Sequence, residues 1–118
     1  MSGLVLLHNA NCSTSRHALE AATAAGADVE VVQYLKRPLD RPALLELIGQ
    51  LEDPPADLVR HDAFFAQLGL RAEDYVTPGA VADLLAEHPR LMQRPVLIKD
   101  GRAIIGRPKD RVAPFLAG

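Results

Sequence analysis

Cys12 is the single cysteine among 118 residues, and it lies in the stretch HNANCSTSRHALE, between an apolar run and a predicted helix. The nucleophile in cysteine chemistry is the thiolate, which is favoured at a helix N-terminus because backbone N–H groups are exposed there. The same N–H groups can bind an oxyanion brought to the sulfur. The placement of Cys12 therefore predicts a reactive thiol beside an anion site.

The residues around Cys12 are polar and suited to this chemistry. We expect the hydroxyl side chains of residues 13–15 to cap the helix, and Arg16 and His8 to add positive charge. Each assignment has an alternative. Cys12 could be a small buried apolar residue, although its polar neighbours argue against that, and His8 could be a hydrogen-bonded residue at a strand end.

A lone cysteine also limits the mechanism. Once Cys12 forms an adduct or a mixed disulfide, only an external thiol can resolve it, so we expect glutathione or a glutaredoxin as partner. A Cys-x-x-Cys oxidoreductase is excluded, because Ser15 occupies the position of the second cysteine. No intramolecular disulfide can form.

The elements that must position Cys12 begin with a β-α-β unit. The apolar run from Leu4 to Leu7 predicts a strand buried on both faces. The alanine-rich segment from Ser13 to Ala25 predicts a helix that Gly26 ends, and Val29, Val31, Val32 and Tyr34 predict a second strand. We expect these strands to be parallel and joined by a right-handed crossover.

A helical segment over about residues 40–88 follows, with helices expected after Asp40, over residues 58–70 and from Thr77 to His88. Two strands over residues 95–98 and 103–105 then flank Asp100-Gly101, a hairpin signal. A last helix follows residue 108 and is weakened by Pro114. This order predicts one α/β domain over residues 1–118, with a thioredoxin-like four-stranded mixed sheet flanked by helices.

Composition restricts the function classes. With 13 basic and 15 acidic residues the net charge is −2, so no overall charge recruits nucleic acid or an anionic membrane. The run Leu4 to Leu7 is too short to span a bilayer, and no basic segment precedes it. We expect a cytoplasmic monomer that binds neither nucleic acid nor membrane and holds no metal or bound cofactor.

Several separated motifs resemble one family. The stretches HNANCSTSR, YLKRPLDRPALLELI, AQLGL, HPRLMQRPVLIKDG and IGRP occur in the order found in the glutaredoxin-coupled arsenate reductases, which have the thioredoxin fold. The resemblance covers essentially the whole chain. It implies arsenate reduction with Cys12 as nucleophile, glutathione as co-substrate and glutaredoxin as partner.

The resemblance also assigns the oxyanion site to Arg60, Arg94 and Arg107. Guanidinium groups suit bidentate recognition of tetrahedral oxyanions and stabilise the charge that develops during displacement. Without the resemblance, each arginine could equally be a solvated surface charge or serve loop geometry. The resemblance further predicts a cis bond before Pro95, which would direct the segment of Arg94 toward Cys12.

The chain departs from the family pattern at two positions near the thiol, Ala10 and Ser13, where the family often has proline and glycine. It also ends soon after its last predicted helix, so we expect it to resemble the short arsenate reductase-like members most closely. Two other functions stay open: a related thiol enzyme that acts on another substrate, and a binding protein like the Spx-type regulators that contact RNA polymerase.

Overall fold

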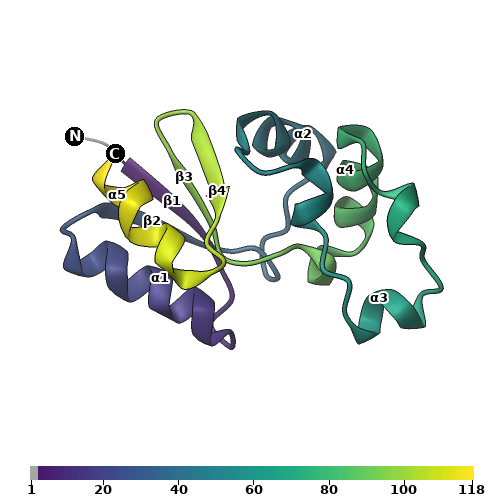
Figure 1. Cartoon of the computed structure of the whole chain (residues 1–118), viewed down its shortest axis with the longest axis horizontal. Helices are drawn as coiled ribbons and strands as arrows, with labels where there is room; N and C mark the ends of the chain where they lie inside the picture. The colour runs from purple at the N-terminus through teal and green to yellow at the C-terminus, as the bar shows by residue number, and fades with distance from the viewer. Residues whose placement is uncertain (1–2) are drawn as a thin grey trace.

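Four apolar segments form a single mixed sheet in the computed structural model, which describes residues 3–118 (Figure 1). The strands are β1 (Gly3–His8), β2 (Asp28–Gln33), β3 (Val96–Lys99) and β4 (Arg102–Ile105), in the spatial order β2-β1-β3-β4. β1 is parallel to β2 and antiparallel to β3, which is antiparallel to β4. The predicted fold class and the predicted parallel pair are confirmed.

Two helices cover one face of this sheet. Helix α1 (Ser13–Ala24) connects the parallel strands, and helix α5 (Val112–Ala117) lies beside it (Figure 1). Small buried residues of α1, Ala18 and Ala22, pack against Leu4 and Leu6 of β1 together with Phe115 of α5. The alanine-rich sequence therefore lets α1 lie close to the strand that carries the Cys12 loop.

The other face of the sheet packs against the helical segment, which contains α2 (Arg41–Gln50), α3 (Ala63–Gln67) and α4 (Pro78–Glu87). Helices α2 and α4 pack against each other, and Figure 1 shows α2 beside β4 with α4 on the far side of α2. Aspartate and threonine caps begin α2 and α4, as predicted. No helix of residues 3–118 is both long and apolar enough to cross a bilayer.

The helix expected over residues 58–70 is wrong in its first half. A 3₁₀ turn spans Pro55–Leu58, Val59 then forms an antiparallel bridge with Met92, and α3 begins at Ala63. The side chain of Asp62 accepts a hydrogen bond from the Phe65 N–H at 3.1 Å and caps α3 there. Long-range pairing therefore overrides the local helical spacing.

The hairpin and the last helix lie where the sequence predicts them. Asp100 and Gly101 both have positive φ, 53° and 76°, as a two-residue hairpin turn requires. After a 3₁₀ turn over Lys109–Arg111, α5 accommodates Pro114 in its first turn. A missing N–H has no effect there, because the first N–H groups of a helix have no partner within it.

Candidate active site

A tight turn between β1 and α1 holds Cys12. The Cys12 N–H donates to the Asn9 carbonyl at 3.0 Å, and the Cys12 carbonyl accepts from the Arg16 N–H at 2.9 Å. Cys12 is therefore the N-cap of α1, with extended backbone angles. Its side chain is partly exposed, so the alternative of a small buried apolar residue is wrong.

Positive and hydrogen-bonding groups surround the sulfur. Burial raises the pKa of the Cys12 thiol, but the Ser15 N–H, the Arg94 and Arg107 guanidinium groups and the Thr14 N–H together outweigh it and lower the pKa to about 7. The Nη1 atom of Arg107 lies 3.7 Å from Sγ. A substantial fraction of Cys12 is therefore thiolate at neutral pH.

His8 and Ser15 support the turn and do not charge it. The Ser15 hydroxyl lies 2.7 Å from His8 Nδ1 and accepts from the Asn9 N–H at 3.1 Å, and no side chain caps α1. The expected hydroxyl caps are thus not formed. Burial, and then the charge of Arg16, lower the pKa of His8, so the expectation that His8 adds positive charge is also wrong.

Arg16 does not take the role predicted for it, which was to add positive charge at the thiol. Its guanidinium donates to the Ala10 carbonyl at 2.8 Å and so stabilises the turn. The positive charge at the thiol comes instead from Arg94 and Arg107.

Arg94 and Arg107 each precede a cis proline, Pro95 and Pro108. The first cis bond confirms the prediction, and the second was not predicted. Arg107 Nη1 donates to the Arg94 carbonyl at 3.1 Å, so the two segments brace each other. The Gly106 N–H donates to the Pro95 carbonyl at 2.8 Å, which joins the end of β4 to the start of β3.

Gly106 permits the close approach of these segments. A Cβ at this position would lie 2.8 Å from Cγ of Pro95 and 3.0 Å from Cδ1 of Leu97. Only glycine fits that space without displacement. Sequence reasoning missed this residue, although its place directly before Arg107 is a signal.

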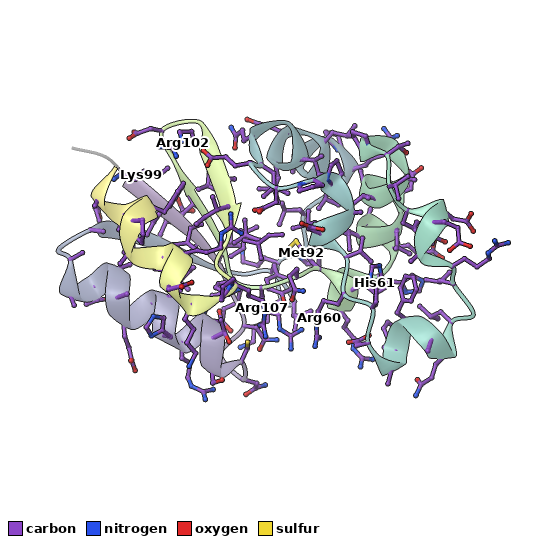
Figure 2. The ribbon with its side chains drawn as sticks, in the orientation of Figure 1. Arg60, His61, Met92, Lys99, Arg102 and Arg107 are labelled. Atoms are coloured by element: carbon purple, nitrogen blue, oxygen red, sulfur yellow. The ribbon has the colours of Figure 1, made fainter. Side chains whose placement is uncertain are left out.

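Arg60 comes to the site from the helical segment. Its N–H donates to the Leu91 carbonyl at 2.7 Å, next to the bridge of Val59, which fixes the backbone near the Arg94 segment. Its guanidinium pairs with Asp62 at 3.1 Å. In Figure 2, Arg60 and Arg107 lie on the same edge of the molecule.

Tyr34 is the other residue that sequence reasoning did not assign to the site. It was predicted as a strand residue, but it follows the last residue of β2 and is 1% exposed. Burial raises the pKa of the Tyr34 phenol, and the neighbouring Arg94, Asn9 and Arg60 only partly oppose that shift. The sequence signal that could have placed Tyr34 at the site is its position: it directly follows a strand parallel to β1, so it lies at the same edge of the sheet as the residues that follow β1.

The arrangement can hold a tetrahedral oxyanion against a nucleophilic sulfur. Backbone N–H groups at the start of α1 and guanidinium groups supply donors on several sides of Sγ. Within residues 3–118, His, Cys, Asp and Glu side chains form no cluster of three that could hold a metal ion.

The sequence model of the ArsC family matches residues 7–115. The chain belongs to the ArsC family. An arsenate reductase of Escherichia coli is 33% identical over 117 residues, which are 98% of this chain and 82% of the relative. An arsenate reductase of Neisseria meningitidis serogroup A is 32% identical and covers 98% of this chain and 100% of its own length.

The solved structures agree with this membership. An arsenate reductase from Vibrio cholerae superposes with a TM-score of 0.84 at 29% identity, covering 95% of this ArsC-family chain and 96% of the other. The predicted membership in an arsenate reductase family is therefore confirmed. The roles of the individual site residues stay predictions.

Proposed function

We propose that this ArsC-family protein reduces arsenate to arsenite, with Cys12 as nucleophile, glutathione as co-substrate and glutaredoxin as partner. The observation that supports the proposal most is the environment of the sulfur: a thiol with a pKa of about 7, at the start of α1 and 3.7 Å from Arg107. Such a sulfur is both nucleophilic and close to an anion site.

In the first step the Cys12 thiolate attacks the arsenic atom of bound arsenate. An As–S bond forms, and one arsenate oxygen leaves as water after protonation. Arg60, Arg94 and Arg107 bind the remaining oxygens, and the N–H groups of Thr14 and Ser15 that face the sulfur support the developing charge. His8 and Ser15 hold the turn in this geometry.

The reduction itself needs external thiols, because residues 3–118 contain no second cysteine. The glutathione thiol then forms a second As–S bond by displacing another arsenate oxygen, which leaves as water. A glutaredoxin thiolate next attacks the glutathione sulfur and breaks that second As–S bond. The resulting S–S bond takes the two thiols to the disulfide level, and the S–As electron pair stays on arsenic. Hydrolysis of the Cys12–arsenic bond releases arsenite. We place this reaction in the cytoplasm, where thiols stay reduced, and assign it to the monomer.

The test is an assay that couples arsenate reduction to NADPH oxidation through glutathione, glutaredoxin and glutathione reductase. We expect NADPH oxidation that depends on arsenate, on glutaredoxin and on Cys12. An inactive wild-type protein whose Cys12 still reacts rapidly with iodoacetamide would overturn arsenate reduction. That result would leave a related thiol enzyme with another substrate.

A further inference from the structure

The outer edge of β4, which is the last strand of the sheet, is paired with residues from outside the sheet. An edge strand leaves alternate backbone groups without a partner from a neighbouring strand. The Ala103 carbonyl accepts from the Glu52 N–H at 2.8 Å. The Ile105 N–H donates to the Asp53 carboxylate at 3.0 Å, and the Ile105 carbonyl accepts from Nη1 of Arg111 at 2.9 Å. Asp53 and Arg111 therefore take the place of a further strand at the end of β4.

Asp53 and Arg111 also form an ion pair with each other. Nη1 of Arg111 lies 2.8 Å from Oδ1 of Asp53, and Oδ2 of the same carboxylate accepts from the Ile105 N–H. The side chain of Asp53 is only 13% exposed, so water competes little for its two oxygens. Charge-assisted hydrogen bonds in such surroundings are strong and fix the geometry of their partners.

This ion pair holds the backbone segment that carries Arg107. Asp53 and Arg111 bind both backbone groups of Ile105, and Nη1 of Arg111 lies 3.5 Å from the Arg107 carbonyl. Between them, the Gly106 N–H donates to the Pro95 carbonyl on the side of β3. The backbone of residues 105–107 is therefore held from two sides, by the start of β3 and by the Asp53–Arg111 pair.

The position of Arg107 depends on this backbone. Its side chain is exposed, and a long exposed side chain has several accessible rotamers. Within residues 3–118, its guanidinium donates to the Arg94 carbonyl at 3.1 Å and lies 3.7 Å from Sγ of Cys12. A small displacement of the backbone would break both contacts, so the anchors of residues 105–107 determine where the Arg107 charge lies.

We propose that Asp53 and Arg111 are positioning residues for Arg107: their ion pair fixes the backbone of residues 105–107, so that the Arg107 guanidinium faces Cys12 and the oxyanion. Through Asp53, the helical segment then acts on the sheet side of the site. The proposal rests on the proposed function for the substrate, whereas the effect on Cys12 needs no substrate. Neither residue lies in the motifs that carry the family resemblance.

The test is Asp53→Ala, which removes the acceptor of the Ile105 N–H and the partner of Arg111. The rate of iodoacetamide alkylation, followed as a function of pH, gives the midpoint for ionisation of Cys12. We expect this midpoint to move upward and the rate at pH 7 to fall about twofold to threefold, because a displaced Arg107 stabilises the thiolate less. In the coupled assay, kcat/KM for arsenate should fall about tenfold, mainly through KM, because a charge-assisted contact to the oxyanion is weakened.

Asp53→Asn is a milder second variant. Its amide oxygen can still accept from the Ile105 N–H, but the ion pair with Arg111 is lost. We expect a smaller upward shift of the alkylation midpoint than in Asp53→Ala. Circular dichroism and urea denaturation check that each variant folds, and Asp53→Asn decides alone if Asp53→Ala does not fold.

Glu52→Ala is the matched control. Glu52 is the neighbour of Asp53 and pairs with Arg102, which lies at the opposite end of β4 from Arg107 (Figure 2). We expect the wild-type alkylation midpoint and the wild-type KM in this variant. In an Arg107→Ala background, Asp53→Ala should not move the midpoint further, because its action passes through Arg107.

A wild-type midpoint and a wild-type KM in the folded Asp53 variants would overturn the proposal. An equal shift in Glu52→Ala, or full additive effects in the double variant, would also overturn it, because either result would show a general loosening of the β4 edge. If the wild-type protein does not reduce arsenate, the proposed function fails, and the alkylation midpoints alone still decide whether Asp53 and Arg111 position Arg107.

Discussion

The sheet and the helical segment supply side chains to the site in different ways. Cys12 follows β1, Tyr34 follows β2, Arg94 lies just before β3 and Arg107 lies just after β4. Since β3 runs opposite to its neighbours, all these positions fall at one edge of the sheet. The helical segment contributes Arg60, which is tied to the sheet side through the pairing of Val59 with Met92.

The charges differ as well. Arg60 is paired with the carboxylate of Asp62, whereas within residues 3–118 no carboxylate forms an ion pair with Arg94 or Arg107. An arginine without a carboxylate partner keeps its full charge for an incoming anion. The comparison predicts that Cys12, Arg94 and Arg107, which lie together at one edge of the sheet, contribute most to catalysis. Arg60 should have a smaller effect.

The largest effect is expected from Cys12→Ser. Serine is close in size but is not ionised at neutral pH, so arsenate reduction should fall at least about 10³-fold, to background, in the coupled assay. Urea denaturation should show a folded protein. Retained turnover would remove Cys12 from the mechanism.

The arginine variants compare the two regions directly. Arg94→Ala and Arg107→Ala should each lower kcat/KM for arsenate about 10²-fold, because each removes a charge-assisted contact to the oxyanion. Arg60→Ala should lower it only about tenfold, since this arginine shares its charge with Asp62. Equal losses in all three variants would show that the helical segment contributes as much as the sheet edge.

The thiol pKa tests the sheet edge without substrate. Because the pKa of Cys12 is about 7 instead of 9, the alkylation rate should rise with pH around a midpoint near 7, and unfolded protein should show a midpoint near 9. Arg107→Ala should move the folded midpoint upward. A folded midpoint near 9 would contradict the role of the surrounding donors.

The same shift has a consequence for stability. The folded pKa lies below the unfolded pKa, so the thiolate stabilises the fold fully above about pH 9, and this contribution is lost as pH falls toward 7. The difference in free energy of unfolding between wild type and Cys12→Ser should therefore increase from pH 7 to pH 9. A difference that is constant with pH would contradict the shift.

The sheet and the helical segment also differ in how well the sequence predicted their structure. The parallel pair of strands, the Cys12 turn and the hairpin were predicted from local signals such as Leu4 to Leu7 and Asp100-Gly101, which act over a few residues. The segment of Arg60 was predicted as helix because its apolar spacing is helical. Its pairing with the segment of Met92 is a long-range contact that local spacing does not contain.

Within the site the same distinction holds. The sequence placed Cys12 at the start of α1, and its family resemblance selected the arginines. The charge state of His8, the acceptor role of Ser15 and the burial of Tyr34 depend on neighbours from other elements. Burial and partners of that kind cannot be read from residue type.

Gly106→Ala should loosen the junction between the two arginine segments. The added Cβ would overlap Pro95 and Leu97, so we expect a loss of about 1–3 kcal/mol in the free energy of unfolding. Gly49→Ala in α2 is the control, because it has open space around its Cβ and should stabilise by about 0.5–1 kcal/mol. If both variants have the same stability, the junction is not tightly packed.

The smallest effect is expected from Asp62→Ala, which tests the helical segment alone. Loss of the cap of α3 should cost about 1 kcal/mol, as should Asp40→Ala, which removes the cap of α2. Only Asp62→Ala should change catalysis, because its carboxylate competes with arsenate for Arg60, so the KM should fall about twofold to threefold. A raised KM would instead show that Asp62 holds Arg60 in the binding position, which would make the helical segment a fixed part of the anion site.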